Sequence, residues 1–117
     1  ALTPETYQLI GKDELAKMKP SAVLINAARG PVVDTDALTD ALRDGTIWAA
    51  GLDVTDPEPI PADHPIVSMQ NVVIAPHIAS ASVDTRDKMA VMAATNLLQA
   101  IRGERPTHLV NPDVLSI

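Results

Sequence analysis

Cysteine and phenylalanine are absent from the sequence, which contains a single tryptophan and a single tyrosine. The lack of cysteine excludes disulfide bonds and thiolate metal sites, and it fits a reducing compartment. With so few aromatic side chains, the hydrophobic core has to consist of valine, leucine, isoleucine, alanine and methionine. No uninterrupted apolar run approaches the roughly 18 residues that a membrane-spanning helix requires. We therefore expect no membrane partner.

Basic residues are outnumbered, because the 117 residues include 9 Lys and Arg against 15 Asp and Glu, for a net charge of −6. A surface of this charge repels nucleic acids and anionic lipids, so we expect no nucleic-acid partner. Hydrophobic residues make up 46% of the chain, which excludes a disordered composition and allows one small domain with a core. The sequence begins with Ala1 and shows no signal-peptide pattern. We expect a cytoplasmic piece of a longer protein.

Three short apolar runs have the length and continuous hydrophobicity that are typical of strands in a parallel sheet buried on both faces. They span residues 22–25, 47–54 and 71–75. Between the first two runs, Asp34 can cap a helix that continues to Arg43 or Asp44. A strand–helix–strand unit of this length predicts a parallel crossover. The predicted fold class is therefore α/β, with part of a parallel sheet flanked by helices.

Helical signals also precede the first strand. Thr3 and Pro4 favour the start of a helix that Gly11 ends, and residues 13–18 have the spacing of a second short helix. Val32 and the residue after it are expected to form a short extended piece.

The last third of the sequence predicts one long helix and a tail. Ser80 or Ser82 can cap a helix that runs to Ile101 or Arg102. Apolar side chains at helical spacing should form its buried face: Met89, Met92, Ala93, Leu97, Leu98 and Ile101. The tail, residues 104–117, should pack onto another part of the protein.

A charged or titratable side chain that could act in binding or catalysis follows each predicted strand. Arg29 follows the first, Glu58 lies between Pro57 and Pro59 after the second, and His77 follows the third. The carboxyl ends of parallel strands share one edge, where ligands bind in open α/β sheets. Arginine suits a carboxylate, histidine exchanges protons near neutral pH, and a glutamate beside it favours the imidazolium and fixes its tautomer. Together these groups suit the reduction of a 2-oxo acid.

Two other chemistries fit less well. Acyl transfer needs a nucleophile, and neither Ser80 nor Ser82 lies in a G-x-S-x-G elbow. Asp56 and Asp63 share a loop but lack the spacing of a calcium site, so we expect no metal. His64, in the same loop, is expected to pin the loop rather than to act in catalysis.

Three ordered motifs carry a family resemblance. Residues 23–34 (VLINAARGPVVD), residues 51–54 (GLDV) with Glu58-Pro59, and residues 76–78 (PHI) closely resemble the D-isomer-specific 2-hydroxyacid dehydrogenases. Within that family, residues 50–65 and the helix after the third motif look most like glyoxylate/hydroxypyruvate reductases. The resemblance extends over nearly the whole chain.

The resemblance implies roles for individual residues. Arg29 would bind the substrate, His77 would donate the proton, and Glu58 would be the partner of His77. Asp53 would lie against the nicotinamide carboxamide. The implied cofactor-binding residues are Ala27, Ala28, Arg29, Asp53, His77, Ala79 and Ser80.

The resemblance also implies an organisation and partners. Residues 1–81 would be the C-terminal part of an NAD(P)-binding Rossmann-like domain, and residues 82–117 a connecting helix and tail that pack on a substrate domain. The cofactor would be NAD or NADP, the substrate a small 2-oxo or 2-hydroxy acid, and the intact protein a homodimer. The sequence contains no G-x-G-x-x-G phosphate loop. It departs from the family at Ala79, commonly glycine, and at Trp48, where a small residue is usual.

Two alternative functions remain open at this point. Transcriptional corepressors share this fold, so the chain could belong to a dinucleotide sensor that acts through binding partners. It could also be an inactive fragment that folds only as an interaction partner.

Overall fold

The computed structural model describes residues 1–116. The chain divides into two compact units, Ala1–Ala79 and a second unit that begins at Ser80. The division falls two residues before the predicted boundary at residue 81.

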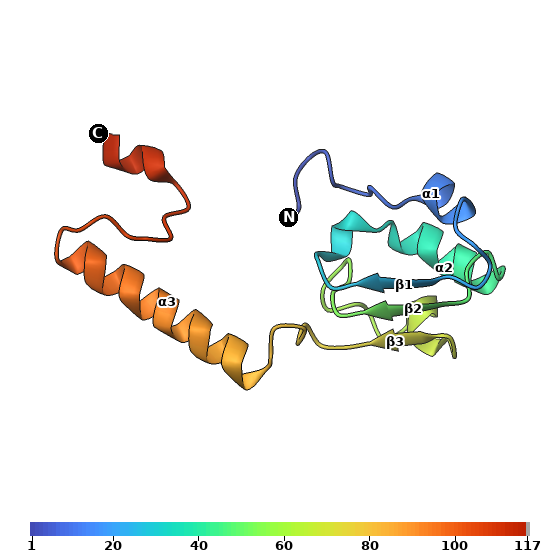
Figure 1. Ribbon diagram of the computed structural model, residues 1–117. Helices are drawn as coiled ribbons and strands as arrows, with labels where there is room; N and C mark the ends of the chain where they lie inside the picture. The colour runs from blue at the N-terminus through green and yellow to red at the C-terminus, as the bar shows by residue number, and fades with distance from the viewer. Residues whose placement is uncertain (117) are drawn as a thin grey trace. The chain divides into compact units, whose positions relative to one another are not determined.

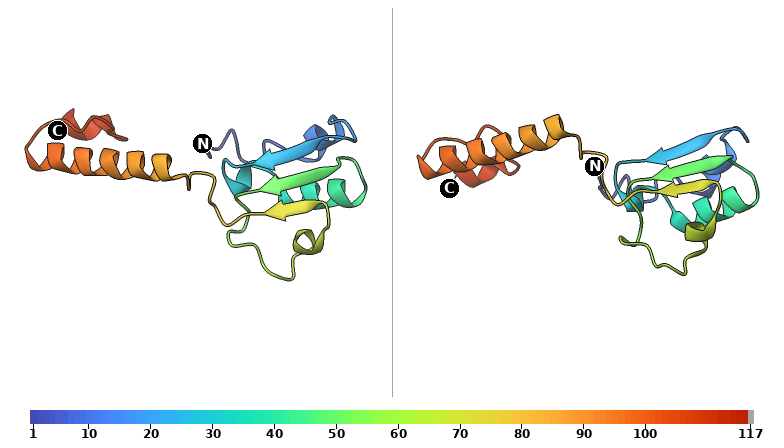
Figure 2. Two further views of the ribbon diagram at one scale, coloured as in Figure 1. Left: turned by 60° about the horizontal axis from the view of Figure 1, so that its bottom comes forward. Right: turned by 90° about the horizontal axis from the view of Figure 1, so that it is seen from below.

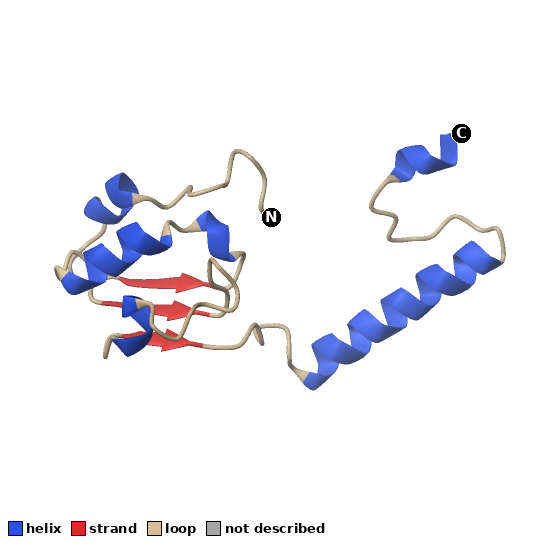
Figure 3. Ribbon diagram, turned by 180° about the vertical axis from the view of Figure 1, so that it is seen from behind, coloured by secondary structure: helices blue, strands red, loops and turns tan. Residues whose placement is uncertain are grey.

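The first unit is built on a three-stranded parallel sheet of β1 (Val23–Asn26), β2 (Ala49–Leu52) and β3 (Val72–Ile74), in the order β1-β2-β3 (Figure 1). Figure 3 shows the three arrows side by side and pointing the same way. In the register, Leu52 pairs with the last residue of each neighbouring strand, so the carboxyl ends lie level with one another. The predicted parallel sheet is confirmed. The second strand is shorter than predicted, because Ile47 and Val54 are buried in the core but lie outside the ladder.

Helices α1 (Lys12–Ala16) and α2 (Thr35–Arg43) cover one face of this sheet, the rear face in Figure 2. The cap predicted for α2 is confirmed, because the Asp34 carboxylate accepts a hydrogen bond of 3.0 Å from the amide of Ala37. A short 3-10 helix, η2 (Pro65–Ser68), adds the buried side chain of Ile66 to those of the two helices. The core joins side chains from these helices and from alternate strand positions: Leu15, Leu24, Leu38, Leu42, Ile47, Ala50, Leu52 and Ile66.

The opposite face of the sheet is not covered by other residues of the first unit. Val23, Ile25 and Val73 are 46%, 69% and 71% exposed. They line a shallow hollow of about 610 Å³ together with Trp48 and Gly51. The prediction that both faces are buried is therefore wrong for this part of the chain. The apolar runs do carry hydrophobic side chains on both faces, but the helices between them pack on only one.

The segment before the sheet also differs from prediction. Residues 4–8 form turns rather than a helix, because the backbone leaves the helical path after one turn and pairs with a later segment. The amide of Gln8 donates to the carbonyl of Pro31 at 2.7 Å, and Ile10 forms a parallel bridge with Val33. The extended piece expected at residues 32 and 33 is present only at Val33, which is extended and forms the bridge, because Val32 ends a 3-10 helix, η1 (Gly30–Val32).

The second unit consists of α3 (Val83–Ile101), the tail and the 3-10 helix η3 (Pro112–Ser116). Of the two serines predicted as caps, Ser82 is used, since its hydroxyl accepts from the amide of Thr85 at 3.3 Å. The predicted apolar face of α3 is not buried by the other described residues of the second unit. Its large side chains are 43–72% exposed: Met89, Met92, Leu97, Leu98 and Ile101.

The tail nevertheless packs back against α3 through hydrogen bonds to polar side chains of the helix. The Oδ1 atom of Asn96 accepts a hydrogen bond from the amide of His108 at 3.1 Å, and the Oε1 atom of Gln99 accepts one from the amide of Thr107 at 2.9 Å. Two amide side chains one turn apart thus hold the tail by its backbone. No helix in residues 1–116 is both long and apolar enough to cross a membrane.

Candidate active site

Glu58 and His77 meet at the carboxyl edge of the sheet. The Nδ1 atom of His77 lies 2.7 Å from the Oε1 atom of Glu58, and the two side chains are 49% and 43% exposed. An ionised carboxylate only accepts hydrogen bonds, so this contact places a proton on Nδ1 and leaves Nε2 to exchange protons with a ligand. The predicted partnership of these two residues is present in the structure, while their catalytic roles stay a prediction.

The loop that carries Glu58 is fixed by two threonine hydroxyls. Thr35, the first residue of α2, donates to the carbonyl of Asp56 at 3.0 Å. Thr55 is buried and donates to the carbonyl of Pro57 at 2.9 Å. Both bonds hold backbone within three residues of Glu58, so its carboxylate is presented from a restrained loop.

His77 is held by Asp53, which follows β2. The Asp53 carbonyl accepts from the amide of His77 at 2.9 Å, and its two carboxylate oxygens accept from the amides of Ile78 and Ala79 at 2.7 and 2.8 Å. One residue therefore binds three consecutive amides. His77 has a φ of 56°, in the left-handed region that a non-glycine residue adopts only when its surroundings hold it there.

These bonds also set the ionisation of Asp53. The hydrogen bond from Ile78 contributes most to lowering the pKa of the Asp53 carboxyl below its usual value, with further contributions from Ala79 and from the positive charge of protonated His77. Partial burial acts in the opposite direction. Asp53 is therefore an anion at neutral pH, next to the imidazole ring.

Arg29 occupies the turn after β1. Its guanidinium is exposed and donates through Nη1 to the carbonyl of Ala28 at 2.6 Å. Within residues 1–116, the Arg29 side chain forms no ion pair with a carboxylate and no hydrogen bond with Glu58 or His77. A planar cation in this state is available to a carboxylate ligand.

Gly30 joins the Arg29 turn to the Glu58 loop. A Cβ atom on Gly30 would lie 1.8 Å from the carbonyl oxygen of Thr55, so only glycine permits this approach of the two backbones. The turn after β1 and the loop after β2 are thus packed directly against each other. The side chains that they carry leave the sheet at the same edge.

The remaining predicted contacts are small residues near this edge. Ala27 and Ala28 are exposed after β1, and the amide of Ala79 is bound by Asp53. Ser80 begins the second unit. His64 pins its loop as expected, since its Nδ1 accepts from the amide of Ile66 at 3.3 Å.

One buried residue near the site was not singled out from the sequence. Asn26 ends β1 and is 5% exposed, and its side chain binds the backbone of Ala28 and of Arg29. The signal was available, because a lone polar residue at the end of an apolar strand is either exposed or hydrogen-bonded.

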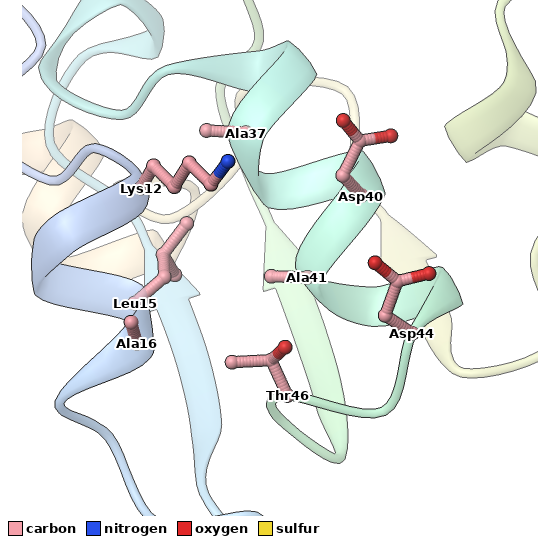
Figure 4. A pocket seen from close by; sticks show the side chains of 8 residues that line it. All are labelled: Lys12, Leu15, Ala16, Ala37, Asp40, Ala41, Asp44 and Thr46. Atoms are coloured by element: carbon pink, nitrogen blue, oxygen red, sulfur yellow. The ribbon is translucent and has the colours of Figure 1, made fainter.

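A hollow between the two helices of the first unit lies away from this edge. A cavity of about 170 Å³ separates α1 from α2, with Lys12 and Leu15 on one wall and Asp40 and Ala41 on the other (Figure 4). None of the residues that line it is a predicted site residue. The site is therefore an open edge in this chain rather than a closed pocket.

Comparison with known proteins identifies the family. Residues 1–79 match the family described as D-isomer specific 2-hydroxyacid dehydrogenase, NAD binding domain. The chain belongs to this family. The second unit lies outside the matched residues.

Individual members of the D-2-hydroxyacid dehydrogenase family agree with this assignment. A glyoxylate reductase from Thermofilum pendens is 54% identical over 116 residues, which are 99% of this chain and 34% of that protein. A crystal structure of a protein from Thermus thermophilus matches with a TM-score of 0.87 and 51% identity, over 93% of this chain and 35% of the other. An NADPH-dependent glyoxylate/hydroxypyruvate reductase from Sinorhizobium meliloti, solved with NADP and malonate, matches with a TM-score of 0.76 and 43% identity, over 83% and 30% of the two chains. The chain spans about a third of the length of these relatives.

The family's cofactor fits the residues at this edge in part. Small side chains at Ala27 and Ala28 leave the backbone after β1 open to a planar ring. The glycine-rich motif that cradles the diphosphate is absent from the 117 residues. The assignment of the nicotinamide end to this edge stays a prediction.

Proposed function

We propose that this chain is part of an NAD(P)-dependent reductase that acts on glyoxylate or hydroxypyruvate. The observation that carries the proposal is the 2.7 Å contact between His77 and Glu58 at the carboxyl edge of the sheet. A histidine fixed in this tautomer, together with an arginine that has no carboxylate partner within residues 1–116 on the turn after β1, suits a substrate that has a carboxylate and an adjacent carbonyl. The reductases among its relatives support the same substrate class.

Each residue has a separate task in the proposed reaction. Arg29 binds the carboxylate of the 2-oxo acid and orients its carbonyl. His77 in its protonated form donates a hydrogen bond from Nε2 to the carbonyl oxygen and then transfers that proton to it. The reduced nicotinamide, when bound, supplies the hydride that goes to the carbonyl carbon. The hydride and the proton together convert the carbonyl into the hydroxyl of the 2-hydroxy acid.

Glu58 sets the condition for this proton transfer. Its carboxylate accepts the Nδ1 proton of His77, and its negative charge stabilises the imidazolium. Oxidation of the hydroxy acid runs the same steps in reverse, with neutral His77 as the base. Reduction therefore needs protonated His77 and oxidation needs neutral His77.

The test is the pH dependence of kcat/KM for glyoxylate reduction by the full-length gene product. We expect reduction to become slower as the pH rises and oxidation to become faster, because reduction needs protonated His77 and oxidation needs neutral His77. Glu58→Gln removes the charge and keeps a hydrogen-bonding group, so it should move this decline in reduction to lower pH. His77→Ala should reduce turnover by about 10²–10⁴-fold. Superimposable profiles for wild type and Glu58→Gln contradict the role of Glu58.

The sensor function gives a different result in the same assay. A dinucleotide sensor would bind NADH or NADPH without turning over glyoxylate or hydroxypyruvate. The relatives named as reductases do not favour this alternative. We also propose that the intact protein is a cytoplasmic homodimer, and sedimentation of the full-length protein tests the dimer.

A further inference from the structure

Asn26 is one of three buried polar residues in the described chain, with Thr39 and Thr55. It is the last residue of β1, and its backbone carbonyl accepts from the amide of Asp53 at 2.9 Å, which extends the pairing of β1 with β2. Its side chain is 5% exposed and lies between the sheet and the turn that follows. A buried amide must satisfy its donor and acceptor inside the protein.

The side-chain oxygen and nitrogen of Asn26 both form hydrogen bonds to backbone groups within the next three residues. Oδ1 accepts from the amide of Ala28 at 3.1 Å, and Nδ2 donates to the carbonyl of Arg29 at 3.0 Å. The two bonds close a tight turn over residues 27–29. The backbone of Arg29 is thereby tied to the end of β1 through one rigid, buried side chain.

The carbonyl of Arg29 also accepts from the amide of Val32 at 3.2 Å, at the start of η1. The guanidinium donates only to the carbonyl of Ala28 within residues 1–116, and that carbonyl belongs to the turn that Asn26 closes. The starting point and direction of the arginine side chain therefore depend on the turn. Bidentate binding of a carboxylate is sensitive to such displacements, because the two N–H groups have a fixed separation.

We propose that Asn26 is a positioning residue that sets the place of Arg29, and through it the affinity for the carboxylate of the substrate. This inference rests on the proposed function, since it requires Arg29 to bind an anionic 2-oxo acid. Asn26 does not touch the substrate. Its effect should appear in the substrate KM far more than in the KM for NADH or NADPH.

Asn71 provides a matched control. It lies just before β3, at the opposite edge of the sheet, and its Nδ2 donates to the carbonyl of Trp48 at 3.0 Å. Asn71→Ala thus removes the same kind of side-chain-to-backbone hydrogen bond away from the site. A structural contribution alone should be similar in Asn26→Ala and Asn71→Ala.

The experiment measures glyoxylate and NAD(P)H kinetics and thermal stability of the full-length gene product. Asn26→Ala should raise the glyoxylate KM by roughly 10-fold, as expected for loss of a buried hydrogen-bonded restraint, and leave the NAD(P)H KM within about 2-fold. Asn71→Ala should lower the thermal midpoint without raising the glyoxylate KM. In Asn26→Ser, the hydroxyl can still accept from the amide of Ala28 but cannot reach the carbonyl of Arg29. The glyoxylate KM of this variant should therefore lie between those of wild type and Asn26→Ala, and the variant should remain folded.

A double-mutant cycle shows whether Asn26 acts through Arg29. In the Arg29→Ala background, Asn26→Ala should raise the glyoxylate KM no further. An unchanged KM in both Asn26 variants, an equal rise in Asn71→Ala, or a rise that persists without Arg29 overturns the inference. If Arg29→Ala itself leaves the glyoxylate KM unchanged, or the wild type shows no turnover, then the proposed function fails as well. A clear loss in Arg29→Ala beside normal Asn26 variants overturns only the role of Asn26.

Discussion

At the scale of single residues, Asp53 connects two strand ends. It follows β2 and binds the three amides that follow β3, so it holds His77 in a backbone conformation that costs about 1–3 kcal/mol for a non-glycine residue. Each carboxylate oxygen has a second acceptor site, so the predicted contact with a nicotinamide carboxamide remains compatible with this arrangement. The structure adds a second task, which is to hold the proton donor.

This task predicts a pH-dependent contribution to stability. The pKa of the Asp53 carboxyl is lowered in the folded protein, chiefly by the hydrogen bond from Ile78. The contribution is therefore fully present above the unfolded-state pKa of about 3.9, and it is lost as the pH falls through the lower folded-state value. An asparagine side chain has only one oxygen, so Asp53→Asn cannot accept hydrogen bonds from both amides. The thermal midpoint of wild type should therefore be higher than that of the variant at pH 5–7, and the difference should shrink below about pH 4.

Asp63→Asn is the control, because the Asp63 side chain is in an exposed loop position. Its thermal midpoint should follow wild type across the same pH range. The full-length protein is measured by calorimetry in buffers of constant ionic strength. A difference between wild type and Asp53→Asn that does not change with pH contradicts the role of the Asp53 charge.

At the scale of elements, the site depends on how closely the loops after β1 and β2 pack. A Cβ on Gly30 would overlap the carbonyl of Thr55 at 1.8 Å, and the obstacle is backbone rather than a flexible side chain. Gly30→Ala should therefore displace both loops and destabilise the protein by about 1–3 kcal/mol or more, as overpacking does. Turnover of glyoxylate should fall too, because the displaced loops carry Arg29 and Glu58.

Gly11→Ala is the matched control for this prediction. A Cβ on Gly11 meets its nearest atom, a carboxylate oxygen of Glu14, at an ordinary 3.6 Å. Urea unfolding and glyoxylate turnover should therefore be near wild type for Gly11→Ala and clearly reduced for Gly30→Ala. Equal behaviour of the two variants contradicts the close packing of the two loops.

Elements with strong local signals were predictable from the sequence. The cap at Asp34 and the apolar stripe of α2 are local, and so are the three hydrophobic runs that form the sheet. Parallel topology then brought Glu58 and His77 to one edge. The predicted helix after Thr3 failed, because pairing of Ile10 with Val33 competes with helical hydrogen bonds and is not visible in local sequence.

The parts of the site that were missed depend on backbone geometry. The binding of three amides by Asp53 requires the positive φ of His77, and no propensity predicts that value for histidine. The two bonds of Asn26 likewise require the tight turn over residues 27–29. Sequence patterns identify the residues that carry chemistry more readily than the residues that hold them in place.

At the scale of the whole molecule, each of the two units has an apolar surface that its own described residues do not cover. One is the sheet face with Ile25 and Val73, and the other is the side of α3 with Leu97 and Ile101, which are 61% and 72% exposed. Exposed apolar patches of this kind mark interaction surfaces. The relatives are about three times as long as this chain, which is 34% of the Thermofilum pendens protein.

These surfaces predict the behaviour of the 117-residue chain produced alone. It should self-associate, and it should show no oxidation of NADH with glyoxylate, because the phosphate-binding motif is absent. Sedimentation velocity at increasing concentration reports the association. The emission of Trp48, the single tryptophan, reports whether the sheet face is involved, because this side chain is 66% exposed beside that face and should shift to shorter wavelength when covered.

Substitutions on the sheet face separate the contribution of this surface from that of α3. Ile25→Thr with Val73→Thr keeps β-branched side chains in the strands but removes apolar area, so it should weaken association and reduce the emission shift. Val110→Thr is the control, since Val110 is 95% exposed in the tail and lies outside both surfaces. If the double variant associates as strongly as Val110→Thr while the Trp48 emission stays unshifted, association runs through α3 alone. A monomer at all concentrations that oxidises NADH with glyoxylate contradicts the prediction, because it would mean that neither the apolar surfaces nor the missing phosphate motif has the consequence argued here.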